Sequence, residues 1–164
     1  MGRFVPAALD CDLPRKSSIA VDRAVNHTMQ GTLKGTVAWF QLEGRPVPTA
    51  AHYCIGRDGE IVQMIHDHRK CYHAGGYNSR SIGIELEAHI GPWPVRRLKN
   101  GKVKTPPFPA DEFPDAMLLN AALVNRLMAD KFGFPRDRVH IIGHNEVPGA
   151  THTDPGPLFP WARF

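Results

Sequence analysis

The residues best suited to chemistry are histidines that stand beside predicted strands and turns. The chain has nine histidines among 164 residues. His27 follows an apolar run and precedes a glycine-containing turn, and His144 follows a second such run. His152 stands two residues before Asp154 in a proline-containing loop. Ligand sites in open α/β sheets gather where strands end, so we expect these three segments to meet at one site.

Two imidazoles and one carboxylate from such segments can form a three-ligand zinc site whose fourth position stays open to water, as in catalytic zinc centres. Bound zinc lowers the pKa of water to about 7 and polarises a carbonyl. The reaction also needs a group that takes and returns a proton. Glu85, on the polar face of a predicted strand, can do this if it faces the metal. Ligands so distant in sequence cannot be paired without a fold, so the residues alone leave the set open.

A second set of potential ligands consists of His52, Cys54, Cys71 and His73. Cysteine and histidine do make structural zinc sites, which keeps this alternative open. A single residue separates Cys71 from His73, whereas such ligands are usually separated by roughly two to four residues. We therefore favour the first set.

Apolar periodicity predicts the elements that must position these residues. Asp58-Gly59 between two apolar runs predicts a hairpin, and Gly133 followed by Pro135 ends the longer helix. The predicted strands are 19–26, 51–55, 61–65, 81–87 and 139–142, and the predicted helices are a short one capped by Thr32 and a long one over 113–132. Helices that alternate with a mixed sheet indicate the α/β class.

Length and composition limit the classes of protein to consider. A chain of 164 residues, 42% of them hydrophobic, suits one domain over 1–164. No apolar run approaches the roughly 20 residues that cross a bilayer, and the first residues lack a secretory signal, so we expect a cytoplasmic protein. Three cysteines without C-x-x-C spacing argue against a disulfide scaffold. The net charge of +4 favours polyanionic partners, although a merely solvated surface explains it equally well.

Six motifs follow one another in the order and spacing of one family. They are His27–Thr32, Ala51–Gly59, His73–Gly75, Ser81–Glu87, Gly143–Val147 and Asp154–Pro157. With these motifs the chain resembles the type 2 N-acetylmuramoyl-L-alanine amidases, relatives of the peptidoglycan-recognition proteins and of short phage amidase lysozymes, from about residue 19 to residue 164. The resemblance implies a central mixed β-sheet flanked by helices, with a zinc cleft on one side.

The resemblance also implies a role for individual residues. It places zinc on His27, His144 and Asp154, and the register of His27 follows from Gly31, four residues later. It makes Glu85 the acid/base residue.

One catalytic position departs from the family pattern. His152 stands where the family usually has a lysine, and we expect it to donate a hydrogen bond to the developing oxyanion. His73 and Asn78 lie on the segment that lines the substrate groove in relatives, so a substrate-binding role is implied for them. Local turn contacts are the competing interpretation of these two residues.

The segment 91–110 matches no regular element. It holds five prolines and five basic residues but no acid, and Asn100-Gly101 could turn a small basic hairpin inside it. Long loops in compact domains are often functional or disordered. The segment is therefore interpreted either as a surface excursion or as a lid or arm that contacts the cell wall.

The implied activity is zinc-dependent hydrolysis of the amide between N-acetylmuramic acid and L-alanine in bacterial peptidoglycan, carried out by a monomer. The basic charge favours a lytic, endolysin-like setting. The rivals are a cytoplasmic amidase that recycles anhydro-muropeptides and a peptidoglycan-binding module without catalysis. We expect no membrane partner and no nucleic-acid partner, because no aromatic and basic platform for nucleic acid is visible.

Overall fold

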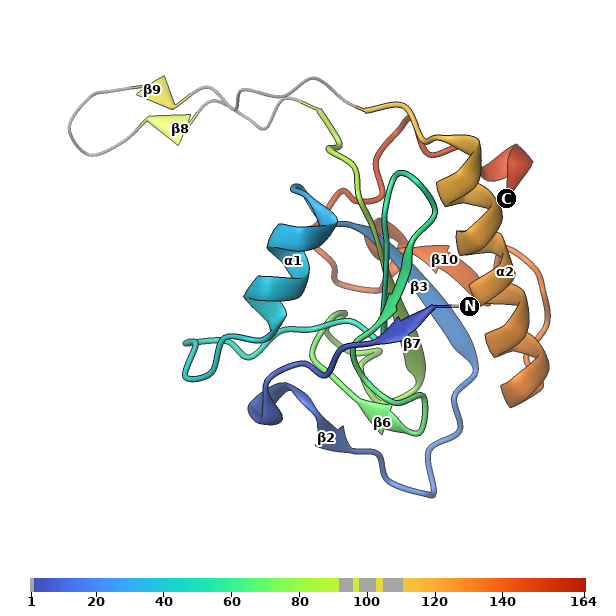
Figure 1. Ribbon diagram of the computed structural model, residues 1–164. Coiled ribbons are helices and arrows are strands. Elements are labelled where there is room, and N and C mark those ends of the chain that lie inside the picture. The colour runs from blue at the N-terminus through green and yellow to red at the C-terminus, as the bar shows by residue number, and fades with distance from the viewer. Residues whose placement is uncertain (1, 92–95, 98–102, 105–110) are drawn as a thin grey trace.

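A mixed six-stranded sheet forms the centre of the computed structural model, which describes residues 2–91, 96–97, 103–104 and 111–164 (Figure 1). The strand order is β1-β5-β4-β7-β3-β10, and only β4 and β5 pair antiparallel. Its strands are β1 (Arg3–Phe4), β3 (Arg23–Thr28), β4 (Tyr53–Ile55), β5 (Ile61–Gln63), β7 (Ser81–Leu86) and β10 (Ile141–Gly143). The α/β class and the mixed sheet predicted from the sequence are confirmed.

Shorter elements complete the described chain. The two α-helices are α1 (Leu33–Phe40) and α2 (Asp115–Phe132). Two-stranded sheets are formed by β2 (Leu13–Pro14) with β6 (Arg69–Lys70) and by β8 (Arg96–Arg97) with β9 (Val103–Lys104). Three single-turn 3₁₀ helices are η1 (Leu9–Cys11), η2 (His144–Glu146) and η3 (Trp161–Arg163).

The two helices lie on opposite sides of the sheet (Figure 1). The α2 side carries Ile82, Ile84 and Leu86 of β7, which are fully buried in one hydrophobic cluster with α2. On the other side, Cys54 and Val62 pack in a second cluster with α1. Successive residues of a strand point to opposite faces, so the alternation in β7 decides which residues face α2. β7 has one apolar face, as the alternation predicts, and Ser81 and Gly83 on its other face are buried as well.

Local signals explain where the helices begin and end. Thr32 caps α1, since its hydroxyl accepts a hydrogen bond from the Gly35 amide at 3.1 Å. The left-handed φ of 74° at Gly133 ends α2, as glycine readily allows. Both helices and the β4–β5 hairpin match the sequence predictions, although α2 begins two residues after Phe113.

Several strand limits differ from the predictions. The strand expected over 51–55 is Tyr53–Ile55, and the strand expected over 61–65 is Ile61–Gln63. Two further strands show the physical reason. The strand expected over 19–26 begins at Arg23 and continues to Thr28, because its ladder with β7 starts at the pair Arg23↔Ser81. The strand expected over 139–142 is Ile141–Gly143, because its pairing partner is 24–26 of β3. In both cases the neighbouring strand, which is distant in sequence, sets the limits.

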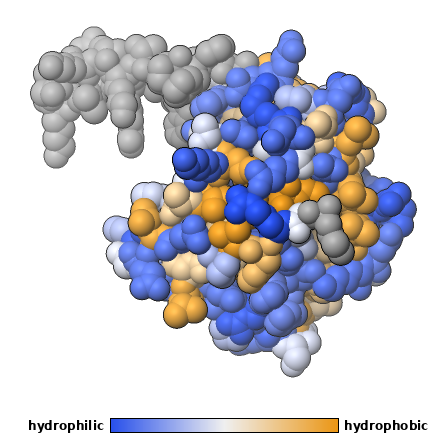
Figure 2. All heavy atoms as spheres, in the orientation of Figure 1, coloured by the Kyte–Doolittle hydropathy of each residue, from blue (hydrophilic) through white to orange (hydrophobic). Residues whose placement is uncertain are grey.

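The basic segment is described only in part. The backbones of β8 and β9 pair antiparallel, in line with the predicted hairpin, while Asn100-Gly101 lies outside the described residues. Within the described chain, no helix has the length and apolarity to cross a bilayer. Apolar residues gather across the middle of the face shown in Figure 2, between bands of hydrophilic residues.

Candidate active site

Sheet register brings the predicted ligands together. His27 lies near the end of β3, and Asn26 before it pairs with Gly143 of β10. His144, the residue after Gly143, therefore leaves the sheet next to His27. The loop that carries Asp154 returns to this place, where the Asp154 carbonyl accepts a hydrogen bond from the Asn145 amide at 2.9 Å. Two parallel strands and one loop contact thus position three side chains.

The donor atoms of His27, His144 and Asp154 converge in a buried cluster and lie within 4.8 Å of one another. His27 Nδ1 is 3.1 Å from both His144 Nδ1 and Asp154 Oδ2, and His144 Nδ1 is 3.3 Å from Asp154 Oδ1. Two imidazoles and a carboxylate in close reach are a donor set that zinc accepts, with room for a fourth ligand. The cluster is therefore consistent with a metal site.

Protonation in the cluster also suits a cation. Burial lowers the pKa of His27, against the opposing effect of Asp154, so the imidazole is neutral and can donate its lone pair. Burial alone would raise the pKa of Asp154. The side-chain contacts with His144 and His27 outweigh it and hold that pKa well below its usual range. A neutral His27 imidazole and an ionised Asp154 carboxylate are the forms in which these two side chains bind metal.

Glu85 lies on the same face of the sheet as His27, because the two residues are partners in the β3–β7 ladder. Its Oε2 is buried and finds no hydrogen-bond partner among the described residues. Burial, together with the negative charge of Asp154, raises the pKa of Glu85 to about 8. A carboxyl group with that pKa and a free oxygen can exchange a proton near neutral pH.

A pocket of about 320 Å³ opens beside Glu85. The other residues that line it come from α1 and the turn before it: Met29, Gly31, Thr32, Gly35, Thr36, Trp39 and Phe40. Glu85 thus borders an opening on the α1 side. A larger pocket of about 430 Å³ is lined mainly by α2 and by none of the cluster residues.

His152 lies at the outer edge of the cluster. Its ring stacks on His144 with centroids 4.3 Å apart, and its Nδ1 is 3.9 Å from Asp154 Oδ1. The side chain is 64% exposed, so one side of the ring faces solvent while the other contacts a metal-ligand candidate. This position is open to a bound substrate.

His73 and Asn78 lie behind His27 and make internal contacts. His73 Nδ1 is 3.1 Å from His27 Nε2, and His73 Nε2 is 3.1 Å from Ser81 Oγ. The Asn78 side-chain oxygen accepts hydrogen bonds from the His73 and Ala74 amides at 2.8 and 2.7 Å. Asn78 therefore shapes the turn that carries His73, and a direct substrate contact stays a prediction for both residues.

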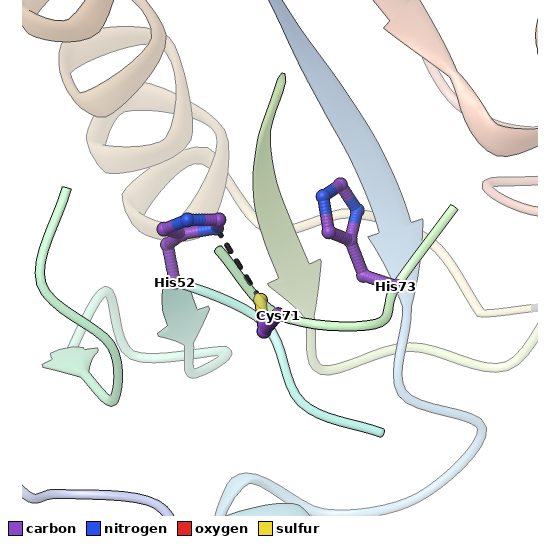
Figure 3. A group of neighbouring side chains, drawn as sticks. All are labelled: His52, Cys71 and His73. Atoms are coloured by element: carbon purple, nitrogen blue, oxygen red, sulfur yellow. Dashed lines mark hydrogen bonds between the residues drawn. The ribbon is translucent and has the colours of Figure 1, made fainter. Parts of the chain in front are cut away.

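Part of the alternative ligand set also comes together. Donor atoms of His52, Cys71 and His73 lie within 4.8 Å of one another, and Cys54 is not in this group. Figure 3 shows the Cys71 sulfur pointing at the His52 ring, 3.6 Å from Nδ1, with the His73 ring apart from both. That same His52 Nδ1 accepts the Gly83 amide at 2.9 Å, and the Arg15 guanidinium lies 3.3 Å from His52 Nε2. An occupied lone pair and a nearby cation make this cluster a poor metal site.

Sequence reasoning missed Ser81, which contacts His73. The available signal was its place on β7: Ser81, Gly83 and Glu85 alternate along the strand and so share the face that His27 occupies.

Comparison with known proteins agrees with this geometry. A family model described as N-acetylmuramoyl-L-alanine amidase matches residues 17–157. N-acetylmuramoyl-L-alanine amidase A of Achromobacter lyticus is 30% identical over 145 residues, which cover 85% of this chain and 78% of that protein. The 1,6-anhydro-N-acetylmuramyl-L-alanine amidase AmpD of Escherichia coli K12 is 32% identical over 142 residues, covering 82% of this chain and 66% of that protein.

Solved structures share the fold. An AmpD derivative superposes with a TM-score of 0.74 at 25% identity, covering 99% of this chain and 92% of that one. The N-acetylmuramoyl-L-alanine amidase LysC of Clostridium intestinale gives a TM-score of 0.68 at 16% identity, covering 99% and 94%. The family model spans most of the sequence and includes all three clustered ligand candidates and Glu85. The chain therefore belongs to the N-acetylmuramoyl-L-alanine amidase family and is an enzyme of that class.

Proposed function

We propose that this amidase uses zinc, held by His27, His144 and Asp154, to hydrolyse the amide between N-acetylmuramic acid and L-alanine. The observation that carries the proposal is the convergence of these three buried side chains on the sheet face that Glu85 shares with His27, where the Glu85 Oε2 has no partner among the described residues. A bound zinc ion supplies Lewis-acid chemistry, which polarises a carbonyl and makes water nucleophilic near neutral pH. The grouping of the three candidate ligands, with Glu85 on the same sheet face as His27, favours this proposal over a non-catalytic binding module.

Glu85 moves the proton in this proposal. Its Oε2, which has no hydrogen-bond partner within the described part of the chain, takes the proton from the attacking water and returns it to the leaving nitrogen. The raised pKa of Glu85 keeps the protonated and the ionised carboxyl both accessible near neutral pH. His152, at the solvent edge, donates a hydrogen bond to the oxyanion that develops on the scissile carbonyl. The pocket next to Glu85 holds the part of the substrate that lies over α1.

The test is digestion of purified peptidoglycan followed by mass spectrometry. We expect free stem peptides that begin with L-alanine and new alanine amino groups, both lost after chelation and restored by zinc. Glu85→Gln should bind zinc and release no stem peptide. Release of reducing sugars without new amino groups would contradict the amidase assignment, and full activity after complete chelation would contradict the role of zinc.

The physical form of the substrate is the finer part of the proposal. We propose the polymer, as in a lytic enzyme, because a net charge of +4 attracts the protein to an anionic wall. The likeness to AmpD, whose name specifies a 1,6-anhydro-muramyl substrate, supports a second candidate, a soluble anhydro-muropeptide. Rates on intact sacculi and on anhydro-muropeptide, measured at two salt concentrations, separate these candidates. A lytic enzyme prefers sacculi and loses rate as salt screens its charge.

A further inference from the structure

A chain of hydrogen bonds runs from His27 into the protein, away from the pocket. His27 Nε2 lies 3.1 Å from His73 Nδ1, and His73 Nε2 lies 3.1 Å from Ser81 Oγ. Ser81 Oγ in turn donates to the Tyr77 carbonyl at 2.7 Å. The chain links a candidate metal ligand to the backbone through two side chains.

The last group of this chain, the Tyr77 carbonyl, decides which atom donates the proton in each hydrogen bond. The Tyr77 carbonyl can only accept, so the one hydroxyl proton of Ser81 points to it. Ser81 Oγ must then accept from His73 Nε2–H. A neutral His73 therefore has a free lone pair on Nδ1 and accepts from His27 Nε2–H. His27 is left with its Nδ1 lone pair facing His144 and Asp154.

We propose that His73 and Ser81 are positioning residues that hold His27 in the tautomer and orientation in which Nδ1 binds the metal. The inference rests on the proposed zinc site. Metal-bound histidines generally donate their second ring N–H to a partner that fixes the ring, and loss of that partner costs about 10- to 100-fold in metal affinity. In this chain a second histidine takes that place.

The fold makes room for this arrangement at Gly83. A Cβ at Gly83 would lie 2.7 Å from both Cγ and Nδ1 of His73, closer than such atoms approach. The His73 ring therefore lies directly over the backbone of β7, between Ser81 and Glu85. The contact to His27 also occupies His73 Nδ1, which is a second reason why His52, Cys71 and His73 do not form a metal site.

The decisive experiment compares His73→Leu with His73→Asn. The two side chains have nearly the same shape, but only asparagine carries an acceptor oxygen close to the position of Nδ1. Zinc affinity is measured by competition with a chelator, with circular dichroism and thermal melting to verify folding. We expect about 10- to 100-fold weaker binding in His73→Leu and recovery to within about threefold of the unchanged protein in His73→Asn. The exposed His68→Gln serves as the matched control and should bind as the unchanged protein does.

The outcomes separate this inference from the proposed function. If the unchanged protein binds no zinc, the metal proposal fails. If it binds zinc and folded His73→Leu binds equally well, the positioning role is refuted while the metal site stands.

A second measurement keeps the inference testable if His73→Leu does not fold. Nitrogen-15 NMR of the zinc-loaded unchanged protein should show both His27 and His73 protonated on Nε2, and a proton on His73 Nδ1 would overturn the inference. Ser81→Ala removes the acceptor of His73 Nε2–H, so we expect a smaller loss of zinc affinity than in His73→Leu. Ser18, an exposed serine, supplies the control variant Ser18→Ala, which should bind zinc as the unchanged protein does.

Discussion

The buried carboxyl group of Glu85 should make the metal-free protein less stable as the pH rises. Its pKa is about 8 in the folded chain, against 4.5 for an exposed glutamate. Between these values the folded state binds more protons than the unfolded state, so stability is fully present below pH 4.5 and decreases as the pH rises through 8. Burial of a carboxylate whose Oε2 has no partner among the described residues is the physical cause.

The size of the effect follows from the two pKa values. As the pH rises from 5 to 8, titration of the Glu85 carboxyl should lower the free energy of unfolding by about 3 kcal/mol, at 1.36 kcal/mol per pKa unit. Glu85→Gln keeps the shape and removes the titration. Groups that do not interact with Glu85 cancel in the difference between the two proteins.

The assay is urea unfolding of the chelator-treated protein and of Glu85→Gln at several pH values from 5 to 8. The stability of Glu85→Gln relative to the unchanged protein should grow with pH and reach a few kcal/mol at pH 8. Zinc should reduce the gap, because a nearby cation favours the carboxylate. Two stability curves that stay parallel across this range would refute the reasoning.

Three further predictions concern the site and the core behind it. Zinc at 100 times its dissociation constant should add about 2.7 kcal/mol of stability, seen as a raised melting temperature; Asp154→Ala should lose this response, and an undiminished rise in that variant would remove Asp154 from the ligand set. His152→Ala should lower kcat by about 10²–10³ with zinc affinity little changed, because the side chain is 64% exposed; a variant with unaltered kcat would contradict the oxyanion role. Asn125→Leu should cost about 1–3 kcal/mol in urea unfolding, because buried Asn26 loses its amide partner from α2; unchanged stability would show that this pair contributes nothing.

Much of the fold could be predicted from local patterns. The alternation of Ile82, Ile84 and Leu86 predicted β7, and Gly133 marked the end of α2, because both signals act over a few residues. The limits of β3 and β10 could not be predicted in this way. They depend on pairing with strands that lie far away in the chain.

By itself the sequence determined which side chains were available and, through six ordered motifs, the family to which they belong. The resemblance carried by those motifs grouped His27, His144 and Asp154, but local sequence patterns give no physical reason for residues 117 and 127 positions apart to meet. Tertiary structure decided their convergence, since only the register of parallel strands and a returning loop bring them within reach. Tertiary structure also decided the raised pKa of Glu85 and the contact of His73 with His27. Both depend on neighbouring groups that lie elsewhere in the sequence and that local patterns do not specify.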